Sequence, residues 1–275
     1  MFSQVKSMDH ALWQFWQHNQ PFNYRLHSRF SHAINWINDE GEMITFLSRD
    51  LPNGPNTMII NIESFNDWAL SECASLKIQD PHMLLSGQTI DLNDVPKWQV
   101  DLPVINDLNP IIIQKIQQFL DENNEALLDL EQMIYQRLDD NFSAMIHAIE
   151  QKNNEDIIQH ASASIGLGLG LTPSGDDRLV GFLLGCYLQS PENLCAIHAL
   201  QIAIDNNRDR TNEISYSMLK HAKNGRFNEW LVNLGDDIAE TDIDLLDQAM
   251  MQVFSIGSRS GGDMLKGLQL SLEQF

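Results

Sequence analysis

The sequence has little positive charge. Its 275 residues include 17 lysines and arginines against 38 aspartates and glutamates, so the formal net charge is −21 at pH 7. Nucleic-acid-binding surfaces need clustered lysine and arginine to neutralise phosphates, and anionic membranes attract the same side chains. The composition therefore excludes nucleic acid and an anionic membrane as main partners. A small anionic ligand is compatible with it, because backbone N–H groups or a bound metal ion can hold an anion.

Cysteines and long apolar runs are also scarce. Cys73, Cys186 and Cys195 form no C-x-x-C pair and no even-numbered set, which predicts reduced thiols in a cytosolic protein. The apolar run at 179–188 is much shorter than the ~20 residues that a membrane-spanning helix needs. The first residues also lack the basic start and apolar stretch of a signal peptide. We therefore expect a soluble, cytoplasmic protein.

The periodicity of the apolar residues changes near residue 108. Before it the pattern is strand-like, after a helix expected at 8–18 and with a short helix near 64–76. Strands are expected at 33–37, 42–47, 58–62, 89–92 and 98–102. From residue 109 onward the apolar residues recur at helical spacing. We predict an α+β fold, with a small β-rich, barrel-like domain over 1–108 followed by a mostly α-helical domain over 109–275.

One stretch, 166–177, concentrates glycine, hydroxyl and carboxylate groups. Its sequence GLGLGLTPSGDD has three glycines at a spacing of two, then hydroxyl residues, then two aspartates that open an apolar helix. The dinucleotide-binding pattern G-x-G-x-x-G does not fit, because Leu171 stands where the third glycine belongs. A phosphate-binding P-loop does not fit either, because Asp176 stands in place of its lysine.

Two interpretations of this stretch are open. The helix that follows is apolar around most of its circumference, so we expect it to be buried, with its charged end opening onto a polar pocket. Alternatively, these residues only cap the helix. Thr172 before Pro173 suits a helix start, and Ser174 with Asp177 matches a capping box.

A second copy of the pattern lies near the C-terminal end. Residues 260–267 repeat the S-G-x-D-x-L-x-G pattern of 174–181, 86 residues further along. Two such helix starts predict a pseudo-symmetric pair, with Ser174 and Ser260 at the rim of one anion-binding pocket. The alternative is a chance likeness of two capped helices. Hydroxyl residues at another helix start are candidates for the same pocket: Thr211, Ser215 and Ser217.

These motifs together resemble those of a known family. The central motif is Gly168-x-Gly170-Leu171-Thr172-Pro173-Ser174-x-Asp176-Asp177-x-Leu179-x-Gly181. Further segments are Ile214-Ser215-x-Ser217-x-Leu219 and Gly257-x-x-Ser260-Gly261-x-Asp263-x-Leu265-x-Gly267, with weaker ones at Arg29, Ala33-Ile34-Asn35, Gly41-Glu42 and Gly54-Pro55. On these residues the chain resembles the AllH family over most of its length.

The resemblance implies one subunit of an oxamate carbamoyltransferase of anaerobic allantoin catabolism. Such an enzyme cleaves oxalurate with phosphate to give oxamate and carbamoyl phosphate. The resemblance also implies partner subunits, among them a protein that resembles an acyl-CoA synthetase subunit. The Ser-Thr-Arg-Thr phosphate loop of ornithine and aspartate carbamoyltransferases is absent from the sequence, so a different fold is implied.

The candidate site residues are compatible with this chemistry, which needs phosphate close to a carbonyl whose developing negative charge is stabilised. Asp176 and Asp177 are the catalytic candidates, either as ligands of a Mg²⁺ ion that bridges to phosphate or with one of them as a general base. The ligand-binding candidates are Gly168, Gly170, Thr172, Ser174, Gly175, Ser215, Ser217, Ser260, Gly261 and Asp263. Arg178 and Lys266 fall at variable positions of the motif, so no role is carried over to them.

A second hypothesis assigns the chain no chemistry of its own. In that case the glycine loops bind a small anion or carboxylate, or only cap helices, and a partner chain carries the reacting groups.

Overall fold

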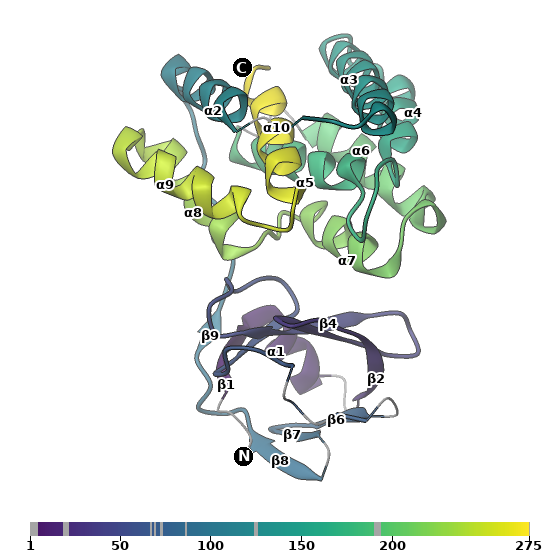
Figure 1. The fold of residues 1–275 in the computed structure, drawn as a ribbon, viewed down its shortest axis with the longest axis vertical. Helices are drawn as coiled ribbons and strands as arrows, with labels where there is room; N and C mark the ends of the chain where they lie inside the picture. Colours follow the sequence, from purple (N-terminus) through teal and green to yellow (C-terminus); the bar gives the residue numbers. More distant parts are fainter. Residues whose placement is uncertain are drawn as a thin grey trace. The chain divides into compact units, whose positions relative to one another are not determined.

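The computed structural model describes residues 5–18, 22–66, 68, 70–71, 74–85, 87–123, 126–189 and 194–274. Its contacts divide the chain into two compact units, Met1–Val100 and Asp101–Phe275 (Figure 1). The division into a β-rich domain over 1–108 and a helical domain over 109–275 stays a prediction. Among the described residues, Cys186 and Cys195 are free thiols, whereas Cys73 lies outside them. None of the described helices is long and apolar enough to cross a membrane.

The first unit is a mixed β-sheet of the half-barrel type with one helix, α1 (His10–His18). Its strands are β1 (Val5–Asp9), β2 (Phe22–Arg29), β3 (Ala33–Ile37), β4 (Met43–Ser48), β5 (Thr57–Ile60), β6 (Ser75–Gln79), β7 (His82–Leu85), β8 (Gln88–Asp91) and β9 (Lys97–Trp98). They are ordered β8-β7-β6-β2-β3-β4-β5-β1-β9 in the sheet. The β4–β5 and β1–β9 pairs are parallel and the other pairs are antiparallel.

Alternating apolar residues of these strands form the core of the first unit. In β6, Leu76 and Ile78 are buried while their neighbours in the strand are exposed. The hairpin expected from 33–37 and 42–47 is confirmed, since β3 and β4 pair with Trp36 opposite Ile44. The Trp36 ring packs against Phe46, with 5.6 Å between ring centroids.

Two expectations for this unit are corrected. The short helix expected near 64–76 does not occur in the described residues of that stretch, and β6 begins at Ser75. Pairing with both β2 and β7 engages the backbone of β6 in the sheet. The strand expected at 98–102 is the short β9, because it pairs along only two residues of β1, Met8 and Asp9.

The second unit is helical, as the sequence predicts. It comprises α2 (Pro110–Glu122), α3 (Asp129–Glu150), α4 (Asn154–Ser164), α5 (Ser174–Leu188), α6 (Leu194–Asn206), the 3₁₀ turn η2 (Arg208–Arg210), α7 (Glu213–Ala222), α8 (Glu229–Glu240), α9 (Ile243–Phe254) and α10 (Ser260–Leu272). A β-sheet followed by helices makes the chain α+β, which confirms the expected fold class.

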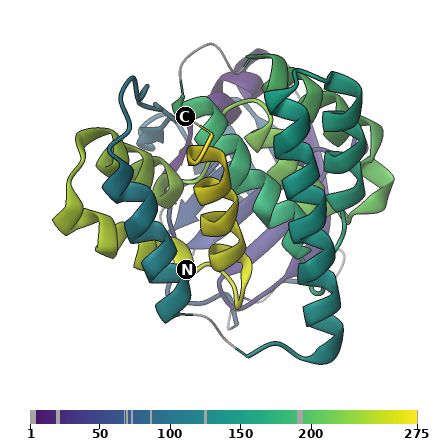
Figure 2. The same ribbon diagram turned by 90° about the horizontal axis from the view of Figure 1, so that it is seen from above.

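Helix α5 forms the centre of the helical unit. Nearly all of its residues are buried, and it packs chiefly against α10 (Figure 2). Glycines allow the contact, because a Cβ on Gly181 would lie 1.8 Å from the carbonyl oxygen of Met264. The reverse contact matches, since a Cβ on Gly267 would lie 1.9 Å from the carbonyl oxygen of Arg178. Both pairs of positions are related by the 86-residue repeat, so the two helices cross as a pseudo-symmetric pair.

The crossing predicts a strong effect of Gly181→Ala. The added Cβ must push α10 away, so we expect the free energy of unfolding to fall by about 3 kcal/mol, measured by urea denaturation. Gly262→Ala in α10 is the matched control, because its Cβ would meet only the ring of Phe254, at 3.3 Å. Alanine is also the better helix former, so this control should lose no stability. Equal losses in the two variants would contradict a packing role for Gly181.

Candidate active site

The two copies of the repeat meet at one cavity. It has a volume of about 380 Å³ and lies where α5 and α10 begin. Thr172, Ser174 and Asp177 line it from the first copy, and Ser260 and Asp263 line it from the second. The Thr172 and Ser260 hydroxyls are hydrogen-bonded at 2.7 Å. Ser174 and Ser260 thus line one pocket, as expected, and its binding of an anion stays a prediction.

The starts of α5 and α10 differ from those of five other helices in this unit, α2, α4, α7, α8 and α9. Five helices begin after a residue whose side chain accepts a backbone N–H: Asn109, Asn153, Asn212, Asn228 and Asp242. Neither α5 nor α10 has such a side-chain bond. The capping interpretation is therefore wrong for Thr172, Ser174 and Asp177, which line the cavity without a side-chain cap hydrogen bond.

Backbone carbonyls of the preceding loops take over part of the capping. The Gly175 N–H donates to Leu167 O at 2.8 Å, and the Gly261 N–H donates to Ile256 O at 3.0 Å. A Cβ on either glycine would lie 2.0 Å from a carbonyl oxygen at the end of the preceding helix, α4 or α9. These two candidate ligand residues thus set the spacing between helices and do not line the cavity.

The glycines of the loop before α5 have different positions. Gly170 lines the cavity, with a φ of +90° that favours glycine. Gly168 lies behind it, where a Cβ would be 2.2 Å from the Ser174 nitrogen. Gly170 is therefore a lining residue of the cavity, whereas Gly168 lets the loop pack closely against the start of α5.

Asp176 is a buried anchor outside the cavity lining. Its Oδ1 accepts the Gly166 N–H at 2.7 Å, and its Oδ2 accepts the hydroxyls of Thr211 and of Ser215, the latter at 2.6 Å. Burial raises the pKa of Asp176, and these donors oppose the shift. Asp176 and Ser215 therefore tie α5 to the start of α7. The remaining candidate of that helix, Ser217, also lies outside the cavity lining.

Asp177, unlike its neighbour Asp176, lines the cavity. It is fully buried, and neither of its oxygens has a hydrogen-bond partner. Its pKa is raised to about 8, chiefly by burial; nearby Asp263 also raises it, while the Ser260 and Thr172 hydroxyls lower it. These hydroxyls lie near the carboxyl without hydrogen-bond geometry. At pH 7 Asp177 is therefore mostly a neutral acid that can donate a proton.

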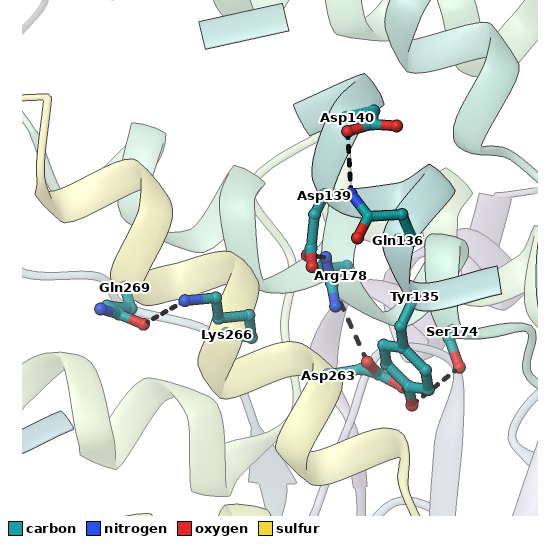
Figure 3. A network of polar contacts seen from close by, with 9 residues as sticks. All are labelled: Tyr135, Gln136, Asp139, Asp140, Ser174, Arg178, Asp263, Lys266 and Gln269. Atoms are coloured by element: carbon teal, nitrogen blue, oxygen red, sulfur yellow. Dashed lines mark hydrogen bonds and ion pairs between the residues drawn. The ribbon is translucent and has the colours of Figure 1, made fainter. Parts of the chain in front are cut away.

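Asp263 occupies the equivalent position in the second copy but has better partners. The Tyr135 hydroxyl donates to its Oδ2 at 3.0 Å and lies 3.3 Å from the Ser174 hydroxyl (Figure 3). Burial raises the pKa of Asp263 to about 6, because Arg178 and the two hydroxyls oppose the shift. The two equivalent carboxyls thus differ in protonation near pH 7, as in enzymes that divide acid and base roles between a pair.

Arg178 is a buried cation next to this pair. Its side chain donates from Nη1 to Asp139 Oδ1 at 2.6 Å, and its Nε lies 3.9 Å from Asp263 Oδ1 (Figure 3). The guanidinium lies over the rings of Tyr135 and Phe142, 5.4 and 5.7 Å from their centroids. Sequence reasoning assigned no role to Tyr135 or Arg178, because Tyr135 matched an apolar helix period and Arg178 a variable motif position.

The residues do not fit a metal ion shared by Asp176 and Asp177. The oxygens of Asp176 already accept three hydrogen bonds, and Asp176 does not line the cavity. In the described part of the chain, no group of three or more His, Cys, Asp or Glu side chains is arranged to hold a metal ion. We therefore assign no reaction step to Mg²⁺.

Asp176→Asn should cost stability. The amide nitrogen of asparagine cannot accept a hydrogen bond, whereas both carboxylate oxygens of Asp176 do. A buried donor, either the Gly166 N–H or the Ser215 hydroxyl, would therefore lose its acceptor. We expect a loss of about 2–3 kcal/mol in the free energy of unfolding. Exposed Asp140, which accepts a hydrogen bond from Gln136, provides the control Asp140→Asn, expected to change stability by less than about 0.5 kcal/mol. A similar small change in Asp176→Asn would rule out its anchoring role.

Asp177→Asn should change how stability depends on pH. A carboxyl with a pKa near 8 in the folded state and a normal pKa near 4 in the unfolded state keeps its proton to a higher pH when the protein is folded. The stability that Asp177 contributes through its raised pKa is therefore fully present below pH 4. It decreases as the pH rises and is lost by about pH 8. Asp177→Asn, which cannot titrate, should gain stability relative to the wild type between pH 5 and 8, by up to about 1 kcal/mol per pH unit. Urea denaturation across this range measures it, and parallel pH curves would contradict the raised pKa.

Comparison with known proteins identifies the family. Residues 164–272 match the family described as oxamate carbamoyltransferase subunit AllH, and residues 4–102 match the AllH family N-terminal domain. No solved structure matches the chain. The first match contains both copies of the repeat that forms the cavity. Because the two matches together span most of the sequence, the chain belongs to the AllH family, described as a subunit of oxamate carbamoyltransferase.

Proposed function

We propose that the cavity between the starts of α5 and α10 is the carbamoyl-transfer site of an oxamate carbamoyltransferase. The reaction would join phosphate to the carbamoyl group of oxalurate and release oxamate, as a step of anaerobic allantoin breakdown in the cytoplasm. The observation that carries the proposal is the buried Asp177 carboxyl, whose oxygens have no hydrogen-bond partner, in one cavity with three hydroxyl groups: Thr172, Ser174 and Ser260.

The proposed step needs a proton donor. A phosphate oxygen attacks the carbamoyl carbon, the bond from that carbon to the oxamate nitrogen breaks, and the nitrogen must gain a proton to leave as an amide. Asp177, neutral at pH 7, can give that proton and take one back in the reverse direction. The cavity hydroxyls can donate to the carbamoyl oxygen as negative charge develops on it.

The phosphate that the proposal requires would meet a cationic side chain in this cavity. Arg259 lines it, with its Nε 3.3 Å from Glu131 Oε1. In the proposal, Arg259 and the cavity hydroxyls hold the phosphate beside the reacting carbon. Partner subunits belong to the proposal, because the family is described as a subunit. We include among them a protein resembling an acyl-CoA synthetase subunit, which the resemblance implies.

Asp177→Asn in the assembled enzyme tests the proposal. Loss of the proton donor should lower kcat for phosphate-dependent oxalurate cleavage by ~100-fold or more, with assembly unchanged in size-exclusion chromatography. Asp140→Asn, on the exposed side of α3, is the matched control and should keep full activity. Wild-type turnover in this direction should decline above about pH 8, where Asp177 loses its proton.

The same experiment distinguishes the proposal from the second hypothesis, that of a subunit without chemistry of its own. If Asp177→Asn keeps full activity in an intact assembly, the chain is a binding or scaffold subunit and the reacting groups lie in a partner chain.

A further inference from the structure

A second cavity lies next to the first. It has a volume of about 300 Å³, and Tyr135, Arg259 and Asp263 line both cavities. The hydrogen-bonded pair Tyr135 and Asp263 therefore borders both cavities (Figure 3). Two further cations, Arg178 and Lys266, line the second cavity and not the first. The second cavity thus has three cationic side chains where the first has Arg259, and three carboxyl groups also line it: Asp121, Asp139 and Asp263.

Arg178 offers this cavity a donor that the protein does not use. Its side chain is 4% exposed, and its buried Nε has no hydrogen-bond partner. The nearest carboxylate oxygen, on Asp263, is 3.9 Å away, which is beyond hydrogen-bond distance. A buried charged donor without an acceptor is costly, and Asp139 and the Tyr135 ring hold the guanidinium in place. The arrangement suits an acceptor atom supplied by a ligand.

Lys266 adds a second positive charge. Its Nζ donates to the neutral amide oxygen of Gln269 at 3.0 Å (Figure 3). Within the described ranges of the chain, no carboxylate forms an ion pair with it. Of the three cations that line the cavity, Lys266 is thus the one without an ion pair among the described residues, whereas Arg259 pairs with Glu131 and Arg178 with Asp139. Carboxylates are favoured partners of both guanidinium and ammonium groups.

Carboxyl groups border the cavity beside its cations. Asp263 can accept hydrogen bonds there, and Asp177 can donate a proton from the neighbouring cavity. A ligand that carries a carboxylate at one end and an amide at the other would satisfy both ends. We infer that the second cavity binds the small amide-carboxylate half of the substrate, with its carboxylate on Arg178 and Lys266 and its amide toward Asp263. Given the proposed function, on which this identification rests, that half is oxamate.

Calorimetric titration of the full-length chain tests the inference with oxamate, oxamide and inorganic phosphate. Oxamide has the size of oxamate but no negative charge. Lys266→Gln should weaken oxamate binding about 10-fold or more, as expected for a lost charge-assisted bond, and should change oxamide and phosphate binding less than twofold. Lys115→Gln removes a lysine that pairs with exposed Asp247 at 3.1 Å, and should bind all three ligands like the wild type.

A second variant guards against indirect effects. Arg178→Gln should also weaken oxamate more than oxamide, and its unfolding curve reports whether the buried site is still folded. Unchanged oxamate binding in Lys266→Gln, equal weakening of oxamate and oxamide, or no binding of oxamate by the wild type would each overturn the inference.

A failure of the proposed function can be told apart from a failure of the carboxylate site. If the assembled wild-type enzyme transfers no carbamoyl group but Lys266→Gln still discriminates oxamate from oxamide, the carboxylate site stands and the reaction is wrong. If the enzyme is active and Lys266→Gln leaves the KM for oxamate unchanged, the reaction stands and the carboxylate site is wrong.

Discussion

The close crossing of α5 and α10 is the constraint on which the candidate site depends. Each helix places a glycine against a backbone carbonyl of the other, Gly181 against Met264 and Gly267 against Arg178. Any side chain at these glycines would separate the helices and, with them, the hydroxyl and carboxyl groups on their first turns. The cavity therefore owes its dimensions to a contact between two backbones in the buried interior, and its polar groups are positioned by that contact.

Differences between two equivalent carboxyls make the pair chemically useful. Asp177 and Asp263 occupy the same position in the repeat, and both line the cavity. Tyr135 and Arg178 favour the ionised form of Asp263, whereas Asp177 has no hydrogen-bond partner and keeps its proton to about pH 8. Arg178 has no counterpart in the second copy, where Met264 stands. Residues that depart from the repeat thus create the asymmetry that acid and base catalysis needs.

Local contacts must overcome the charge of the whole chain if the ligand is an anion. A net charge of −21 gives no long-range attraction for a carboxylate or phosphate. Buried Arg178 and half-buried Lys266 act at short range, where a low dielectric strengthens their interaction with a bound anion. Binding at such a site depends on shape and donor placement more than on electrostatic steering.

The sequence by itself determined the division into a β-rich and a helical part, the hairpin of β3 and β4, and the pairing of the two S-G-x-D-x-L-x-G copies. Periods of two and 3.6 residues and an exact pattern of small and polar residues are local properties that sequence records. Only the tertiary structure decided which of the neighbours Asp176 and Asp177 faces the cavity. Adjacent helix residues point about 100° apart, and the rotation of α5 about its axis is fixed by the glycine contacts with α4 and α10. For the same reason Tyr135 and Arg178 could not be found from spacing: they reach the site from different helices, and their roles follow from the packing of those helices.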